Sequence, residues 1–188
     1  NPQFNKMTLN NSSGLRLDGN LQVNNTLTLT SGTLDFGTTA KSVTIIGNVS
    51  GGGALSMAGV GLAHSLTLIG ASNSAGSLTT TTGSGSNVTY SLNGKQTMIA
   101  GTYQKLSCTG GGTKTLNGST TAEDYLTICS GVTLADGGYT LTEKGHISNN
   151  GSHTGAGEIL LTGGSAQHIL SGTGSYTNLE LNDARGAT

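Results

Sequence analysis

The amino-acid sequence predicts an all-β protein: a parallel β-solenoid (β-helix) with three short strands in each coil of about 20 residues, right-handed by the usual chirality of parallel crossovers. Three observations support this fold class. Apolar and polar residues alternate in short triplets, the triplets recur about 20 residues apart, and no stretch has the periodicity of an amphipathic helix. Strands of three residues are too short to form stable hairpins, so we expect each one to pair with copies in neighbouring coils.

The triplets run from the N-terminus to the end of the chain. Each one points two apolar side chains to one face of its strand and the central residue to the other face. Turn sequences such as Asp-Gly-Asn, Ser-Gly-Thr and Asn-Gly-Ser separate them. The predicted strands are residues 7–9, 15–17, 21–23, 27–29, 43–45, 66–68, 106–108, 126–128, 159–161 and 179–181.

The spacing of the triplets indicates how the coils stack. Leu29 follows Leu9, and Leu126 follows Leu106, at the same interval of one coil. About nine coils at the strand spacing of roughly 4.8 Å would form a rod near 45 Å long. Lys105, Ser107, Lys114 and Asn117 are expected to face solvent, and Gly110, Gly111 and Gly112 to form a corner. The predicted core stack is Leu9, Leu29, Leu106, Cys108, Leu126, Ile128, Leu161 and Leu181.

A longer repeat lies over the coils. Residues 4–32 align without a gap on residues 103–131, so that Phe4 falls on Tyr103, and a third copy begins at Tyr176. This divides one continuous solenoid into a first long unit (1–102), a second, shorter unit (103–175) and the start of a third (176–188). Because the chain begins and ends inside this pattern, we expect the parent protein to continue in both directions.

Composition excludes several classes of function. Charged residues make up 9% of the chain, against about 25% in typical globular proteins, and the net charge is −1. A nucleic-acid-binding protein would show a basic patch, so nucleic acid is excluded as a partner. No run approaches the roughly 18 apolar residues of a membrane helix, so we expect no membrane insertion.

The two cysteines leave two arrangements open. With a regular coil of about 20 residues, Cys108 stacks on Ile128 and points inward, while Cys129 lies beside it and points outward. With a local bulge that lengthens the coil, Cys108 stacks on Cys129 and a disulfide between coils becomes geometrically allowed. Buried free thiols are the default expectation.

No residues suggest catalysis, a cofactor or a metal. The four histidines, His64, His146, His153 and His168, show no metal-ligand spacing and are expected in surface turns. Glu123 and Asp124 form the only adjacent acidic pair, and we expect them in a solvated turn, since neighbouring carboxylates that point to opposite faces make no acid–base couple.

Threonine occupies the outward centre of several triplets, namely at Thr8, Thr28, Thr44, Thr67 and Thr127. A flat threonine ladder is typical of ice-binding solenoids, so ice binding stays open as an alternative. Threonine also favours exposed strands in general. Aromatic residues, at 4%, are too few for a sugar-stacking platform.

Several motifs carry a resemblance: Tyr-x-x-Leu before a glycine-rich corner, then TKTLNG, LTICSGVTL and GGYTLT, within residues 103–142. They resemble the repeats of giant secreted surface proteins and adhesins of Bacteroidota. The resemblance implies a non-enzymatic, extracellular structural or adhesive segment of a larger cell-surface or filament protein. Its partners would be neighbouring repeats or further copies end to end, with surface glycans as another class. A polysaccharide-binding or polysaccharide-cleaving β-helix is the alternative.

Overall fold

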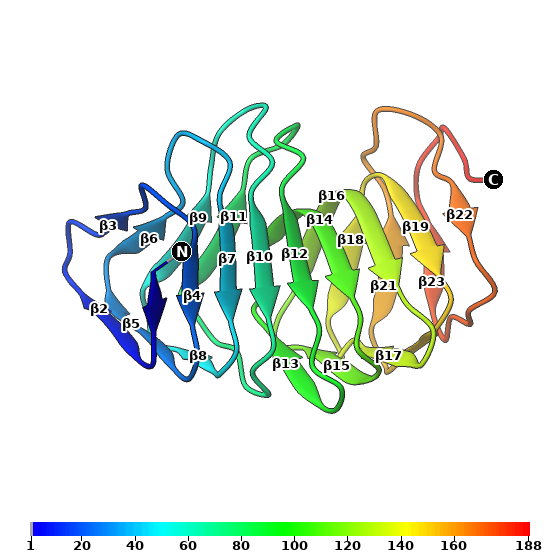
Figure 1. Cartoon of the computed structure of the whole chain (residues 1–188). Coiled ribbons are helices and arrows are strands. Elements are labelled where there is room, and N and C mark those ends of the chain that lie inside the picture. The colour runs from blue at the N-terminus through cyan, green and yellow to red at the C-terminus, as the bar shows by residue number, and fades with distance from the viewer. Residues whose placement is uncertain (1) are drawn as a thin grey trace.

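The fold is a β-solenoid of about nine coils, seen in a computed structural model that describes residues 2–188 (Figure 1). Every strand pair within those residues is parallel, and no helix occurs among them. Leu9 pairs with Leu29, Leu106 with Leu126, and Ile159 with Leu179. The predicted fold class is therefore confirmed, because triplets about 20 residues apart lie directly on one another.

Most coils contribute a short strand to each of three faces, and on the second face two coils contribute only an isolated bridge, at Asn73 and Ser175. The first face consists of β1 (Gln3–Phe4), β4 (Leu21–Val23), β7 (Ser42–Ile45), β10 (Ser65–Leu68), β12 (Asn87–Tyr90), the C-terminal parts of β14 (Thr102–Cys108) and β16 (Thr120–Ile128), β19 (His146–Asn149) and β22 (Leu170–Ser171).

The second and third faces complete the coils. The second face consists of β2 (Met7–Asn10), β5 (Leu27–Ser31), β8 (Val49–Ser50), β13 (Gln96–Met98), β15 (Gly112–Leu116), β17 (Val132–Ala135) and β20 (Ser152–Thr154). The third face consists of β3 (Leu15–Arg16), β6 (Thr33–Asp35), β9 (Ala54–Met57), β11 (Ser77–Thr80), the N-terminal parts of β14 and β16, β18 (Thr140–Glu143), β21 (Glu158–Leu161) and β23 (Leu179–Leu181).

The predicted core residues are buried, except for Leu181, but they belong to three different faces of the solenoid. Leu9 stacks on Leu29 on the second face, whereas Cys108 stacks on Ile128 on the first. Leu161 is buried on the third face. The expectation that Leu181 is buried is wrong: it pairs in register with Leu161 but stays 47% exposed, because β23 has no strand on its outer side among the described residues.

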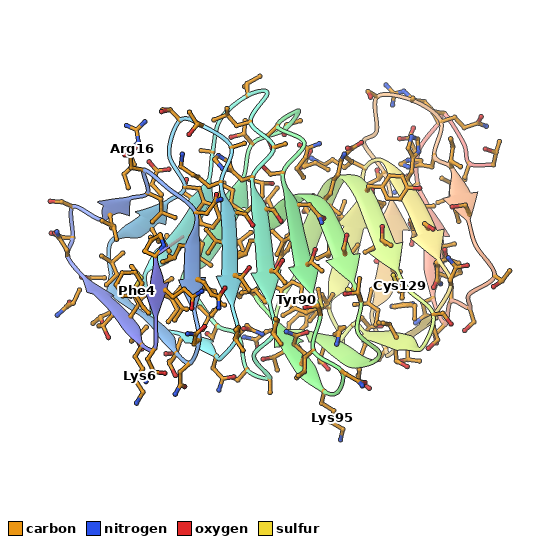
Figure 2. All side chains as sticks on the ribbon, in the orientation of Figure 1. Phe4, Lys6, Arg16, Tyr90, Lys95 and Cys129 are labelled. Carbon is orange, nitrogen blue, oxygen red and sulfur yellow. The ribbon has the colours of Figure 1, made fainter. Side chains whose placement is uncertain are left out.

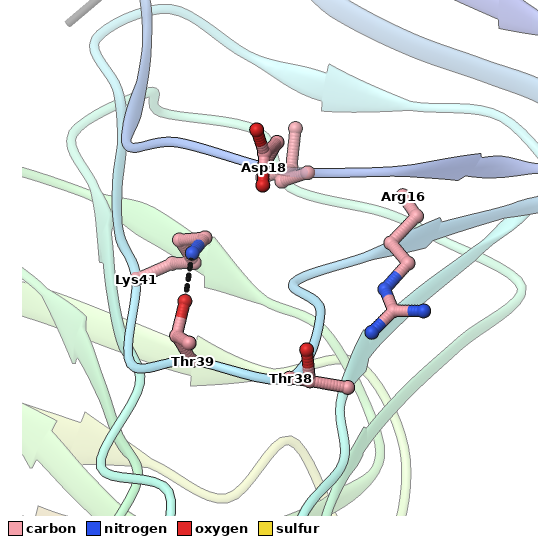
Figure 3. Close-up of a pocket in the computed structure, with 6 residues that line it drawn as sticks. Arg16, Asp18, Thr38, Thr39 and Lys41 are labelled. Atoms are coloured by element: carbon pink, nitrogen blue, oxygen red, sulfur yellow. Dashed lines mark hydrogen bonds between the residues drawn. The ribbon is translucent and has the colours of Figure 1, made fainter.

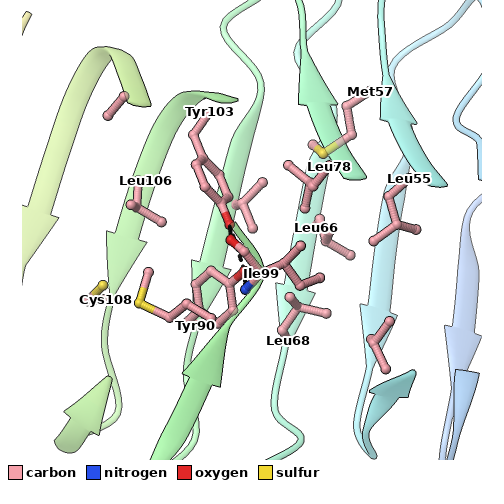
Figure 4. Close-up of a cluster of buried hydrophobic side chains, with 14 of the residues drawn as sticks. Leu55, Met57, Leu66, Leu68, Leu78, Tyr90, Ile99, Tyr103, Leu106 and Cys108 are labelled. Atoms are coloured by element: carbon pink, nitrogen blue, oxygen red, sulfur yellow. Dashed lines mark hydrogen bonds between the residues drawn. The ribbon is translucent and has the colours of Figure 1, made fainter. Parts of the chain in front are cut away.

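Two tyrosines fill the middle of the interior (Figure 4). The hydroxyls of Tyr90 and Tyr103 lie 2.8 Å apart, and their rings meet edge to face at 6.4 Å. Both hydroxyls also bond to the backbone of Ile99: its N–H donates to Tyr90, and its carbonyl accepts from Tyr103. These bonds satisfy polar groups that burial would otherwise penalise.

The long repeat does not coincide with the coils. Phe4 lies on the first face, in register with Val23, whereas Tyr103 lies on the third face beside Ala122. The coil length also varies, since the step along the chain from Val43 to its partner Leu66 is longer than the step from Val88 to its partner Leu106. Aligned copies therefore land on different faces, and the sequence repeat does not mark a structural unit.

Candidate binding surface

The expectation that the histidines lie in surface turns is wrong: three are buried, and His146 begins strand β19. His64, His153 and His168 are buried, and only His146 reaches the surface. His64 Nδ1 accepts a hydrogen bond from the Lys41 amide at 3.1 Å. Desolvation by burial lowers the pKa of both His64 and His153. These three side chains fill the interior at corners of the coils, and the alternation of apolar and polar residues alone does not reveal this.

Asp136 organises the most polar of these corners. Its Oδ1 accepts hydrogen bonds from the amides of Gly138 and Gly157 at 2.7 and 2.9 Å. Its Oδ2 lies 3.1 Å from His153 Nε2, an ion-pair distance without hydrogen-bond alignment, and both side chains are fully buried. A buried pair of this kind holds three segments of chain together but has no route to solvent, so it forms no accessible reaction centre.

Lys114 points inward rather than to solvent, and the expectation that it faces out is wrong. Lys114 is fully buried, and its ammonium donates hydrogen bonds to the carbonyls of Leu92, Gly94 and Gly111. Gly111 belongs to the glycine corner, where the φ angles of Gly110, Gly111 and Gly112 are all positive, as expected. Tight glycine turns aim their carbonyls inward here, and the lysine supplies the missing donor.

The cysteines are free, so the disulfide alternative is wrong. The register between Lys105 and Cys108 runs without a bulge, and Cys108 therefore pairs with Ile128 instead of Cys129. Burial raises the pKa of the Cys108 thiol to about 12, which keeps it protonated and unreactive at neutral pH. Among residues 2–188, no three His, Cys, Asp or Glu side chains are grouped as metal ligands.

Glu123 and Asp124 lie inside β16, so the expectation of a turn before this strand is wrong. Glu123 pairs with Lys144 of the following coil at 2.9 Å, and Asp124 pairs with Lys105 of the preceding coil at 3.7 Å. The two carboxylates are therefore engaged in opposite directions along the rod.

Most other cationic side chains are isolated. Figure 2 shows Lys6, Arg16 and Lys95 extending from separate parts of the rod. Arg16 borders a hollow of about 200 Å³ together with Asp18, Thr38, Thr39 and Lys41 (Figure 3). The Lys41 ammonium bonds to the Thr39 hydroxyl rather than projecting into the hollow. No aromatic side chain lines this hollow, so it offers no stacking surface.

The segment that connects the third face to the first face varies in length along the rod. Six residues (36–41) connect β6 to β7, seven (58–64) connect β9 to β10, and six (81–86) connect β11 to β12. Eight residues (162–169) connect β21 to β22 at the other end. Between these loops β14 and β16 cross the corner without interruption, and only residues 144–145 separate β18 from β19.

Figure 1 shows the long loops rising on both sides of a lower stretch above β14 and β16. We call this stretch the low corner. It collects four of the chain's charged side chains and an aromatic ring that faces outward from the first face. Its residues are Gln104, Lys105, Glu123, Asp124, Tyr125, Lys144, Gly145 and His146.

A row of hydroxyls runs along the outer side of the first face. Thr44 pairs with Thr67, which pairs with Thr89, and the register continues without interruption to β22. We call this the hydroxyl row: Thr44, Thr67, Thr89, Ser107, Thr127, Ser148 and Ser171.

A second outward row lies beside it at the low corner. Lys105 pairs with Tyr125, and Tyr125 pairs with His146. The Tyr125 and His146 rings meet edge to face with centroids 6.0 Å apart. Sequence reasoning missed this group because its members come from three successive coils, and only the coil register brings them together.

No protein family, no curated protein and no solved structure matches this chain. Residues 2–188 include no helix of the length and apolarity needed to cross a membrane.

Proposed function

We propose that this chain is a non-enzymatic, extracellular structural and adhesive repeat segment of a larger cell-surface or filament protein. The supporting observation is the unbroken parallel stacking of about nine coils around one narrow core. Stacked coils give a stiff rod whose length grows with each added coil, which suits a protein that must extend from a surface. The charged side chains at the low corner neutralise one another, as expected of a stable outer surface rather than a reaction centre.

The two ends of the rod support stacking on neighbouring repeats or on further copies. The third-face register runs without interruption from Leu15 to Leu179. Leu15 is 41% exposed at one end, while Leu179 and Leu181 are 38% and 47% exposed at the other. A coil stacked head to tail would place leucine against leucine in the same column and pair free strand edges.

Small-angle scattering of the chain at increasing concentration tests this proposal. We expect a rod near 45 Å long at low concentration and lengthening particles at high concentration. Leu179→Lys with Leu181→Lys should keep the rod and abolish the lengthening. Polysaccharide lyase or hydrolase activity of the purified chain, or lengthening that survives both substitutions, would contradict the proposal.

A second candidate, ice binding, is favoured by one observation, the seven hydroxyls of the hydroxyl row in register on a parallel sheet. Such a row repeats at the strand spacing of about 4.8 Å and could order water in a regular array. Thermal hysteresis measured on the chain tests it. Thr67→Lys should remove the effect and Thr28→Lys, on the second face, should not. A chain without thermal hysteresis excludes this candidate.

A further inference from the structure

We propose that the low corner and the adjoining hydroxyls bind a neutral polysaccharide, with Tyr125 as the stacking residue. This inference rests on the adhesive part of the proposed function and names its partner class. The binding patch consists of two outward rows of three residues each, and the members of each row are paired in register across β14, β16 and β19. These residues are Lys105, Tyr125, His146, Ser107, Thr127 and Ser148.

The low aromatic content rules out an extended sugar-stacking platform, but one outward ring, Tyr125, is enough to stack a single sugar unit. A pyranose presents a face of C–H groups that packs on an aromatic ring, and tyrosine adds a hydroxyl at the rim. The ring is held by its edge-to-face contact with His146 at 6.0 Å. Tyr125 is partly exposed on the outer side of β16, which leaves its hydroxyl within reach of a ligand.

His146 is fixed as a donor. Its Nδ1 accepts a hydrogen bond from the Ile169 amide at 3.1 Å, which places the proton of the neutral ring on Nε2. The loop that supplies Ile169 (residues 162–169) also borders the low corner. The patch therefore has a held aromatic ring flanked by an oriented N–H donor and, one coil back, by the Lys105 ammonium.

The charge balance selects a neutral partner. Lys105 lies 3.7 Å from Asp124, and Lys144 lies 2.9 Å from Glu123, so each cation at the low corner has its own carboxylate. A polyanion such as nucleic acid or an acidic polysaccharide would find no net positive field. A hydroxyl-rich neutral chain instead finds interleaved donors and acceptors, which match its own hydroxyls.

The extent of the patch fits a chain rather than a single sugar or a protein. The long loops 81–86 and 162–169 belong to the fourth and eighth coils, about 19 Å apart at the strand spacing. Several sugar units can lie between them. A protein partner would call for a cluster of exposed apolar anchors, whereas Tyr125 is the one large aromatic anchor of this patch.

Affinity electrophoresis of the chain tests the inference, in gels that contain mannan, xylan or a mixed-linkage β-glucan as neutral probes and alginate as the anionic probe. We expect retardation by at least one neutral polysaccharide and none by alginate. The retardation should persist from about 0.05 to about 0.5 M salt, because screening affects only charged partners.

Tyr125→Ala should weaken the binding by roughly tenfold or more, as for an anchor residue at an interface. Tyr139→Ala is the matched control, since Tyr139 is 41% exposed at a different corner and should leave binding unchanged. Circular dichroism and unfolding curves should confirm that both variants keep the fold. Tyr125→Phe separates the ring from its hydroxyl and should retain most of the affinity.

Three results would overturn the inference: no retardation by any neutral probe, retardation by alginate alone, or wild-type binding by folded Tyr125→Ala. None of these affects the rod dimensions in solution, so the patch can fail while the structural role stands. Conversely, cleavage of a probe would contradict the non-enzymatic role and not the binding patch.

Discussion

The two halves of the rod differ in how the chain connects the third face to the first face. In residues 2–86 the third-to-first corner is spanned by loops of four to seven residues, and the buried titratable side chains are Lys41 and His64. In residues 105–188 the corresponding connections of the sixth and seventh coils shrink to none or two residues, whereas that of the eighth coil has eight. This half buries a lysine, aspartate, glutamate or histidine side chain at five positions: Lys114, Asp136, Glu143, His153 and His168.

In the second half, a short connection with a side-chain cap occurs at each of the three corners. Asp136 accepts from the Gly138 amide, Glu143 from the Gly145 amide and Asn149 from the Gly151 amide, each two residues further on. The capping side chain satisfies a backbone amide near the start of the connection, as Asp35 also does for Gly37 in a six-residue loop of the first half. All ion pairs within residues 2–188 also lie in the second half.

The largest test of this comparison is Asp136→Ala. Removing the carboxylate leaves the amides of Gly138 and Gly157 without their acceptor and His153 without its partner, all in the interior. We expect a loss of about 3–5 kcal/mol in the free energy of unfolding. Asp35→Ala is the matched control in the first half, where a half-buried carboxylate caps only Gly37, and should cost about 1 kcal/mol.

Urea unfolding followed by far-ultraviolet circular dichroism measures both variants. Equal losses for Asp136→Ala and Asp35→Ala would show that the two halves do not differ in how they depend on caps.

Lys114→Met sharpens the comparison at the second-face corner. Methionine fills the same volume but donates no hydrogen bond, so the carbonyls of Leu92 and Gly111 lose a buried donor. We expect a loss of about 2–4 kcal/mol. Lys95→Met, at an exposed position, should stay within about 0.5 kcal/mol of the wild type. A Lys114→Met protein as stable as wild type would mean that these carbonyls find other donors.

Glu143 makes the stability of the second half depend on pH. Burial above all, with repulsion from Asp124 and Glu123, raises the pKa of Glu143 to about 9, against a hydrogen bond from Gly145 that lowers it. Between the pKa of the unfolded chain and about 9 the folded protein holds a proton that the unfolded chain has lost. Stability should therefore fall as pH rises through this range, by up to about 1.4 kcal/mol per pH unit.

Glu143→Gln keeps the side chain neutral at every pH. The variant should be more stable than wild type at pH 8 and should lose most of the slope between pH 5 and pH 8. Thermal unfolding at several pH values measures this. Glu180→Gln, at an exposed position, removes a carboxylate without touching the interior and should keep the wild-type slope.

The fold was predictable for two reasons. The alternation of apolar and polar residues indicates which side chains are buried, and the spacing of the triplets indicates which strands pair. Leu9, Leu29, Leu106 and Leu126 take the pairings that the regular spacing of the triplets requires. The buried polar side chains at the corners were not predictable from alternation, which treats Lys114 and His153 as polar and therefore outward. In the structure, backbone carbonyls at one corner and the carboxylate of Asp136 at another provide partners for these two side chains in the interior. The patch at Tyr125 was missed for another reason, since the coil length varies along the rod and only the actual register fixes which side chains become neighbours.

The smallest expected effect concerns the cysteines. Cys108 stacks on Ile128, and Cys129 is half-buried beside it with its amide bonded to the Cys108 carbonyl. Both thiols are free, so a reducing agent should not move the unfolding midpoint, and Cys129→Ser should change stability by about 0.5 kcal/mol or less. Thiol titration of the denatured chain should find two reactive groups. A midpoint that drops on reduction would mean that a bulge lengthens the coil there, and the outward row of Lys105, Tyr125 and His146 would then lose its register.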